Sequence, residues 1–199
     1  MGMLADWFLP AFSFLLITIK KMIRIVITSD HHVDNEAQRI SELLCERFDI
    51  LHLRKPQWTI DECRRLLDEI DSSLYDRIVI HDFYELYTEY NLRGIHLTGR
   101  NPEIPAGITP KHISCSCHSL EEVSQRKPNM NYVFLSPIFD SISKHGYKST
   151  FPYETLKEAS SQGIIDSKVM ALGGINDERI EIIRKIGFGG YAMLGNIWK

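Results

Sequence analysis

Two stretches of the chain combine glycine with residues that favour anion binding. Gly173-Gly174 is followed by Asn176, a typical helix N-cap, and Gly195-Asn196 repeats the theme close to the C-terminal end. Glycine lets the backbone approach a phosphate closely, and the N–H groups at the start of a helix can bind it. We interpret these glycines and Asn196 as a phosphate-binding site, in preference to the alternative that they only form tight turns.

The segment Ser141-Ile142-Ser143-Lys144 is a second candidate anion site. Two hydroxyls and an ammonium group that converge on one point suit a polyanion. The alternative is a solvated loop. The loop runs as far as Tyr153, however, and a long ordered loop usually has a function. We therefore expect it to close on a ligand.

Further polar side chains follow the ends of the other predicted strands: Arg54 and Lys55, His81 and Asp82, His96, and Ser116 with His118. Surface loops are polar in most proteins, so each residue alone proves little. Their agreement in position across several strands is the evidence for a common site.

The sequence Cys115-Ser116-Cys117-His118 also invites a metal interpretation. It lacks a second pair of ligands at the spacing of a zinc site, so we favour small buried side chains. The four cysteines form no disulfide framework, which predicts a reducing, cytoplasmic environment.

Short apolar runs alternate with helical patterns from Met22 onward. We predict strands over 23–28, 49–54, 77–81, 94–97, 112–116, 132–136, 168–172 and 190–194. Helices are predicted over 35–48, 59–70, 84–90, 153–160 and 176–185, and another begins at 119. Thr59 with Glu62, and Ser119 with Glu122, have the spacing of capping boxes.

Several predicted strands, such as Ile78-Val79-Ile80 and Val133-Phe134-Leu135, are continuously apolar. This pattern indicates a parallel sheet covered by helices. Eight such units close most simply into a (β/α)8 TIM barrel, a single α/β domain over residues 22–199. A doubly wound open sheet is the alternative, but no G-x-G-x-x-G follows the first strand. Only five residues follow Leu194, so the eighth outer helix is missing.

Residues 1–21 form an apolar N-terminal extension. Leu4 to Ile19 is almost wholly apolar, but it is short for a membrane span and is interrupted by Asp6 and Pro10. One interpretation is a start codon set too early, with Met22 as the true start. The other is a helix that covers the region of the missing eighth helix or touches a membrane, without stable insertion.

Five ordered motifs resemble the thiamine phosphate synthase family, which also contains the TenI-type thiazole tautomerases. They are Leu51-His52-Leu53-Arg54-Lys55, Gly94-Ile95-His96-Leu97, Ser116 to Glu122, Ser136 to Lys144, and Ala171 to Ile175. The resemblance implies a transferase of thiamine biosynthesis. Such an enzyme joins an aminopyrimidine methyl diphosphate to a thiazole phosphate, releases pyrophosphate and uses Mg²⁺.

The resemblance also implies roles for individual residues. Arg54 would contact the diphosphate, and Asp82, with Asn101, would hold the metal. Pyrophosphate would lie against Ser116, Ser141, Ser143 and Lys144, and the thiazole phosphate against Gly173, Gly174, Gly195 and Asn196. His52, Lys55 and His118 would also bind substrate, and His81 would act in catalysis.

Departures from the family pattern leave alternatives open. Asn101 stands where the family usually has a second carboxylate for the metal, and Arg100 can replace part of the charge of that metal site. Lys55 is displaced by one residue from the position of the lysine in the family motif. The tautomerase branch carries a catalytic histidine where this chain has Pro137, although His81 or His118 could supply another acid/base group. The alternatives are therefore a thiazole phosphate tautomerase and a non-catalytic binder of phosphorylated thiamine precursors.

A net charge of −3 predicts no general affinity for nucleic acid or anionic membrane. The expected partners are small phosphorylated thiamine precursors, and the sequence is compatible with a homo-oligomer.

Overall fold

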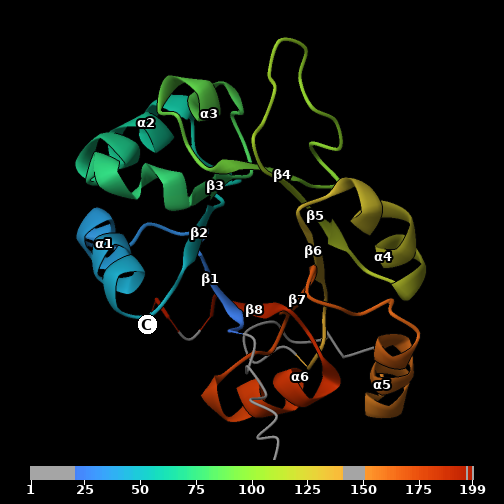
Figure 1. Cartoon of the computed structure of the whole chain (residues 1–199). Coiled ribbons are helices and arrows are strands. Elements are labelled where there is room, and N and C mark those ends of the chain that lie inside the picture. The colour runs from blue at the N-terminus through green and yellow to red at the C-terminus, as the bar shows by residue number, and fades with distance from the viewer. Residues whose placement is uncertain (1–20, 141–150, 196, 199) are drawn as a thin grey trace, which may run out of the picture.

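The computed structural model describes residues 21–140, 151–195, 197 and 198. Eight parallel strands close into a barrel in chain order, and β1 pairs with β8 through Ile23 and Gly190 (Figure 1). The strands are β1 Ile23–Ile27, β2 Ile50–Leu53, β3 Ile78–Ile80, β4 Gly94–Leu97, β5 Ile113–Cys117, β6 Tyr132–Leu135, β7 Val169–Leu172 and β8 Gly190–Met193. The predicted (β/α)8 barrel is therefore confirmed, and every predicted strand is present within one or two residues.

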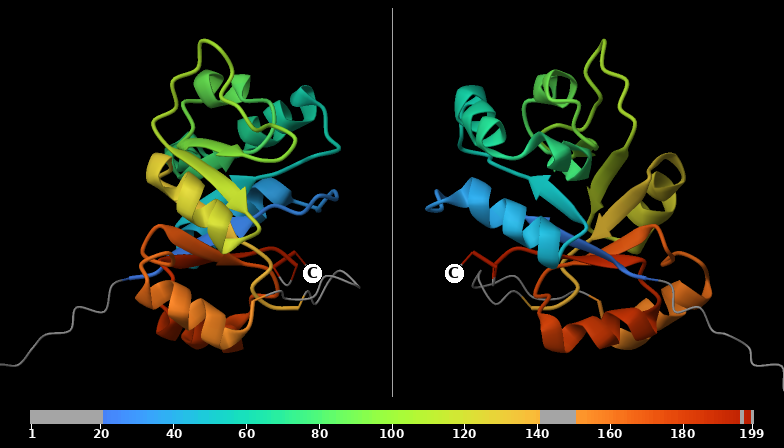
Figure 2. Two further views of the ribbon diagram at one scale, coloured as in Figure 1. Left: turned by 90° about the vertical axis from the view of Figure 1, so that its right-hand side faces the viewer. Right: turned by 60° about the vertical axis from the view of Figure 1, so that its left-hand side comes forward.

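The helices form an incomplete ring outside the barrel (Figure 1). They are α1 Glu36–Glu46, α2 Ile60–Glu69, α3 Glu85–Glu89, α4 Leu120–Arg126, α5 Tyr153–Ser161 and α6 Ile180–Ile186, with 3-10 turns η1 Ser72–Arg77, η2 Lys127–Asn129 and η3 Asp177–Arg179. The connection from β4 to β5 contains no helix, and it projects from the flank of the barrel as a long loop (Figure 2). The residues described after β8 form a turn.

Local capping explains where several helices begin. Thr59 and Glu62 form the predicted capping box of α2, with the Thr59 hydroxyl 3.3 Å from the Glu62 amide. Ser119 caps α4 as predicted, but the Glu122 carboxylate accepts from the His118 amide, so the box is displaced by one residue. Asn176 caps a 3-10 turn, which continues into α6.

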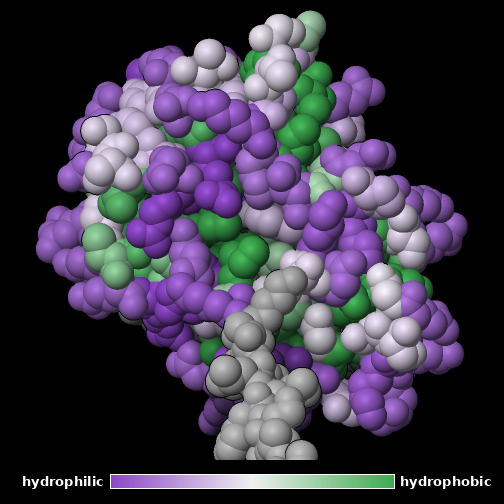
Figure 3. All heavy atoms as spheres, in the orientation of Figure 1, coloured by the Kyte–Doolittle hydropathy of each residue, from purple (hydrophilic) through white to green (hydrophobic). Residues whose placement is uncertain are grey.

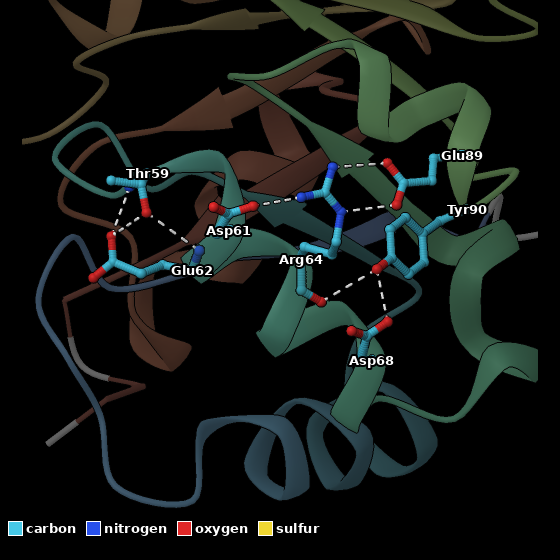
Figure 4. A network of polar contacts seen from close by, with 7 residues as sticks. All are labelled: Thr59, Asp61, Glu62, Arg64, Asp68, Glu89 and Tyr90. Atoms are coloured by element: carbon cyan, nitrogen blue, oxygen red, sulfur yellow. Dashed lines mark hydrogen bonds and ion pairs between the residues drawn. The ribbon is translucent and has the colours of Figure 1, made fainter.

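Figure 4 shows how polar contacts join α2 to the short helix α3. Arg64 lies 2.6 Å from Asp61 of its own helix and 2.8 Å from Glu89 of α3. The Tyr90 hydroxyl donates to Asp68 at 2.7 Å. A five-residue helix has little stability of its own, so these contacts hold α3 in place beside β3 and β4.

Alternate residues of each strand face either the bore of the barrel or the helices. The bore contains an apolar cluster of Ile25, Ile27, Ile50, Val79, Tyr132, Phe134, Met170 and Ala192. The larger cluster between strands and helices includes Val26, Leu51, Ile95 and Val133. The same alternation places four polar side chains in the bore: His52, His96, Ser114 and Ser116.

The end of the chain packs beside β1 and α1. The Trp198 indole donates to the Ile27 carbonyl at 2.7 Å, and the Arg39 guanidinium lies 5.5 Å from the centre of the indole ring. Arg39 also donates to the Ile197 carbonyl at 3.0 Å. The tail thus covers part of the gap between α6 and α1 (Figure 1). The expected covering by residues 4–19 lies outside the described residues.

On the face seen in Figure 3, polar side chains cover most of the surface over the helices. Apolar side chains are visible toward the centre of the ring of helices. Among the described residues, the large exposed hydrophobic side chains are Ile104, Tyr153 and Ile182. No helix within the described ranges is long and apolar enough to cross a membrane.

Candidate functional site

A chain of hydrogen bonds crosses the bore from β6 to the end of β3. His52 Nε2 lies 2.5 Å from the Tyr132 hydroxyl, and His52 Nδ1 lies 2.8 Å from His81 Nε2. All three side chains are buried. The other ring nitrogen of His81, Nδ1, is buried and has no hydrogen-bond partner among the described residues. Buried polar atoms without a hydrogen-bond partner are rare in folded proteins, so His81 Nδ1 calls for an explanation.

His96 lies against the same group from β4. Its Nδ1 is 2.8 Å from the Ser114 hydroxyl and its Nε2 is 2.9 Å from the Ser116 hydroxyl. The ring stacks on His81 with 4.2 Å between the centroids and 22° between the planes. Ser116 is only half-buried, so this group reaches toward the C-terminal rim, where the sites of such barrels lie.

Burial keeps these imidazoles neutral. It is the largest cause of the lowered pKa of His52 and of His81, and neighbouring imidazoles act in the same direction. The pKa of His96 falls to about 3, through burial first and then through the charges of Arg126, His112 and Arg54. Neutral histidine both donates and accepts, which allows the rings to bond to one another.

The three histidines are also a potential metal site, because their ligand atoms lie within 4.8 Å of one another. A metal ion binds an imidazole nitrogen close to the plane of the ring. The stacked, nearly parallel rings of His81 and His96 cannot both point at one ion without rotating. The arrangement therefore suits hydrogen bonding better than metal binding.

A second group of polar residues surrounds Asp82 at the end of β3. One oxygen, Oδ1, accepts from Arg100 at 3.1 Å and from the Asn101 amide at 3.2 Å. The same amide donates to the His81 carbonyl at 3.0 Å, which connects the two groups. The second oxygen of Asp82, Oδ2, is buried without a partner among the described residues. The structure thus brings Asp82, Asn101 and Arg100 together, as the sequence suggested.

Arg54 and Lys55 are neighbours in sequence but lie in different environments. The Arg54 guanidinium makes no hydrogen bond or ion pair with the described residues, and its charge lowers the pKa of His81 and His96. The Lys55 ammonium is buried, 2.7 Å from the Glu36 carboxylate and 4.1 Å from the centre of the Trp58 ring. Lys55 therefore forms an ion pair inside the protein, and its contact with substrate remains a prediction.

Close packing explains why residues 173 and 174 are glycines. Both have positive φ, 97° at Gly173 and 64° at Gly174. A Cβ atom on Gly173 would lie 2.8 Å from Pro137, and one on Gly174 would lie 2.5 Å from the Asp140 carbonyl. The pair therefore has a structural role beneath the segment after β6, independent of any phosphate.

The other predicted site residues lie outside the hydrogen-bonded group of the bore or outside the described residues. His118 is exposed, and its Nδ1 lies 3.1 Å from the Ser136 carbonyl, outside the hydrogen-bonded chain of the bore. Gly195 is exposed in the turn after β8. The predicted contributions of Ser141, Ser143, Lys144 and Asn196 lie outside the described residues.

Two residues that complete the polar group of the bore, Ser114 and Tyr132, were not predicted from the sequence. A signal was present in Ile113-Ser114-Cys115-Ser116-Cys117, where hydroxyls occupy every second position of a strand. Period-two alternation places such residues on one face. It would have grouped Ser114 with Ser116 and placed them both opposite the buried cysteines.

Comparison with known proteins identifies the family. The family model described as "Thiamine monophosphate synthase" matches residues 24–197. A solved thiamine phosphate pyrophosphorylase of Bacteroides thetaiotaomicron is 46% identical, with a TM-score of 0.81, over 89% of this chain and 85% of that one.

Curated relatives agree at lower identity. A "Putative thiamine-phosphate synthase 2" of Aquifex aeolicus is 26% identical over 80% of this chain and 88% of its own length. For a thiamine-phosphate synthase of Listeria welshimeri the identity is 30%, and the alignment covers 60% of each protein. This chain belongs to the thiamine monophosphate synthase family.

Proposed function

We propose that this chain is a thiamine-phosphate synthase. The reaction joins an aminopyrimidine methyl diphosphate to a thiazole phosphate and releases pyrophosphate. The carbon–oxygen bond to the diphosphate breaks first, and the thiazole nitrogen then captures the pyrimidine methyl cation. Pyrophosphate takes the electron pair of the broken bond, so negative charge develops on the leaving group.

The observation that carries this proposal is a cation and a carboxylate oxygen, on Arg54 and Asp82, that have no polar partner among the described residues. Arg54 follows β2 and Asp82 follows β3, and these adjacent strands end at the same rim of the barrel. A guanidinium whose hydrogen-bond donors are not used by the described residues can bind a diphosphate and stabilise its growing charge. Ser116, half-buried on β5, would donate to the same leaving group.

Other contacts of the proposal involve the loops beyond β6 and β8. Ser141, Ser143 and Lys144 would enclose the pyrophosphate. The thiazole phosphate would lie at Gly173-Gly174 and Gly195-Asn196. The support here is the resemblance of these motifs to the family and the usual location of phosphate sites in this fold.

Magnesium remains part of the proposal, and Asp82 is the residue that would hold it. Mg²⁺ beside phosphates is commonly bound through only one or two carboxylates together with the phosphate oxygens. The partnerless Asp82 Oδ2 fits one such ligand, whereas the amide nitrogen of Asn101 already donates to Asp82. Bound there, the ion would neutralise charge on the diphosphate.

A coupled assay of pyrophosphate release, with both substrates and with or without Mg²⁺, tests the proposal. We expect release only when both substrates are present, and we expect Arg54→Gln to lower kcat strongly. The matched control is Arg65→Gln, which removes an exposed guanidinium from α2. Metal-free proton exchange on the thiazole would instead identify a tautomerase. Binding without turnover would identify a non-catalytic binder.

A further inference from the structure

A cavity lies outside the barrel, alongside the helices α1 and α2. These two helices lie side by side (Figure 1), and the cavity has a volume of about 620 Å³. Ligand sites in proteins usually enclose about 300–1,000 Å³, whereas one water molecule takes about 30 Å³. The cavity is therefore large enough for a small organic molecule. Among the described residues, those that line it are distinct from the residues assigned to the synthase site.

The buried carboxylate of Glu36, the first residue of α1, forms part of the cavity wall. Its side chain is only 4% exposed. One oxygen, Oε2, accepts from the Lys55 ammonium at 2.7 Å. The other oxygen, Oε1, is buried and has no hydrogen-bond partner among the described residues. A buried carboxylate oxygen costs free energy unless a donor binds it, so the wall contains an acceptor that lacks a donor.

The charged residues of the cavity wall are predominantly acidic. Glu62 and Glu69 come from α2, and Arg65 lies between them in the sequence. Together with Glu36, the wall carries three carboxylates and one guanidinium. Even after Arg65 and Lys55 each compensate one carboxylate, one negative charge remains. A hollow lined by an excess of one charge attracts ligands of the opposite charge, which here are cations.

Apolar side chains form another part of the wall. Val33 comes from the loop before α1, Trp58 from the loop before α2, and Leu66 from α2 itself. Leu66 is buried, and Val33 and Trp58 are half-buried. The Lys55 ammonium lies 4.1 Å from the centre of the Trp58 ring, so this ring already binds one cation. A ligand with a cationic head and an apolar body would match both parts of the wall.

We propose that this cavity is a binding site for a small primary ammonium ion that carries a short apolar chain. The ammonium group donates a hydrogen bond to Glu36 Oε1, and the chain packs against Val33, Trp58 and Leu66. A primary ammonium has three donors, so the others remain for the acidic residues of α2 and for water. The inference goes beyond the proposed synthase function, because both substrates of that reaction carry phosphate groups and are anions.

Other classes of ligand fit the wall less well. An anion would be repelled by the Glu36 carboxylate, and a neutral alcohol could donate to Oε1 but would not balance the excess negative charge. A divalent metal ion needs several oxygen ligands around one point. Within the described part of the chain, no group of three potential metal ligands converges at this cavity.

Titration of the full chain with n-butylamine tests the site by ¹H–¹⁵N NMR. Like the side chain of lysine, this amine is protonated at pH 7.5. The reporter is the Trp58 indole N–H, whose resonance is identified by its loss in Trp58→Phe, and we expect it to shift saturably. The Trp198 indole, which donates to the Ile27 carbonyl, is the internal control and should not shift. The matched ligands 1-butanol and butyrate have the same chain with a neutral or an anionic head.

An equal shift with 1-butanol would overturn the proposal, because the cavity would then recognise apolar surface alone. A larger shift with butyrate, or no shift with butylammonium, would overturn it as well. In the native chain we also expect nuclear Overhauser contacts between the butyl protons and the side chains of Val33 and Leu66. Contacts only with residues elsewhere would place the ligand outside the cavity and contradict the site.

Glu36→Gln tests the acceptor in the wall. It removes a charge-assisted hydrogen bond, so we expect butylammonium to bind roughly ten- to a hundredfold more weakly. Glu46→Gln, which removes an exposed carboxylate from the end of α1, is the control and should bind as the native chain does.

A second variant keeps this test decisive if Glu36→Gln does not fold. Combining Glu36→Gln with Lys55→Met removes both charges of the buried pair, and the same loss of affinity is expected. Unchanged affinity in a folded Glu36 variant would overturn the proposal. If neither variant folds, the Overhauser contacts in the native chain decide. The pyrophosphate-release assay tests the synthase separately, because it contains no butylammonium.

Discussion

His81 and His96 stack in the bore with 4.2 Å between their centroids and 22° between their planes. Two imidazolium ions could not remain so close in a buried site, because their repulsion would not be screened by water. The neutral state of this pair is therefore a condition of the folded structure, and it has a measurable consequence for stability.

Acid should destabilise the protein through these buried histidines. The pKa of His96 is about 3 in the folded chain, below its ordinary value of 6.5. The unfolded chain therefore takes up a proton that the folded chain excludes as the pH falls from 6.5 toward 3. Stability is complete above pH 6.5 and declines below it, by at most about 1.4 kcal/mol per pH unit for each such histidine.

Urea unfolding at pH 7.5, 6.5 and 5.5 measures this decline. We expect a shallower decline in His96→Asn than in the native chain, whereas His32→Asn, an exposed control, should keep the native slope. Equal slopes in all three proteins would contradict the assignment of a low pKa to His96.

The buried pair of Glu36 and Lys55 makes a second prediction. Its atoms lie 2.7 Å apart, and burial raises the pKa of Glu36 although the Lys55 charge opposes the rise. Lys55→Met leaves a buried carboxylate without its partner and should cost about 3–5 kcal/mol of unfolding free energy. Combining it with Glu36→Leu should restore part of the loss. A surface-like cost below 1 kcal/mol would show that Lys55 is not buried as described.

A third prediction concerns magnesium. Asn101→Asp places a second carboxylate 3.2 Å from Asp82 Oδ1, where an amide now donates. Two carboxylates hold Mg²⁺ beside a diphosphate better than one, so the Mg²⁺ concentration that half-saturates turnover should fall. Asn129→Asp, on the exposed turn before β6, is the control. Saturation at micromolar Mg²⁺ in the native chain, with no change in the variant, would contradict the one-carboxylate argument.

The proposed phosphate site makes a fourth prediction. Gly174→Asp cannot test it cleanly, because the new Cβ would meet the Asp140 carbonyl at 2.5 Å and disturb the fold. Gly195→Glu changes an exposed turn instead. Like charges about 4 Å apart repel by about 1–4 kcal/mol, so the affinity for a thiazole phosphate should fall markedly in calorimetry. Ser124→Glu, which adds an exposed carboxylate on α4, should bind as the native chain does.

The sequence predicted the fold well because local patterns determine it. The continuous apolar strands, the Thr59 capping box and the Asn176 cap are all local features, and all are confirmed. The motifs around Arg54 and Asp82 also indicated the rim where polar residues gather. The roles predicted for Arg54, Ser116 and Asp82 remain predictions, as do those of the residues in the loops.

Contacts across the barrel could not be predicted in the same way. Nothing local distinguishes the buried Lys55 from Arg54, whose guanidinium has no partner in the described part of the chain. The difference depends on Glu36, nineteen positions before Lys55 in the sequence. The bond between His52 and Tyr132 joins residues eighty positions apart. It depends on which face of each strand the closed sheet turns inward, and alternation alone does not decide that.

Among the described residues, the hydrogen-bonded polar side chains of the bore lie on neighbouring strands, β2 to β6, or directly after one of them. They are His52, His81, His96, Ser114, Ser116 and Tyr132. The strands that complete the circle contribute Ile25, Ile27, Met170 and Ala192 to the bore. The described part of the bore therefore has one wall that carries hydrogen-bonding groups and an opposite wall that is wholly apolar.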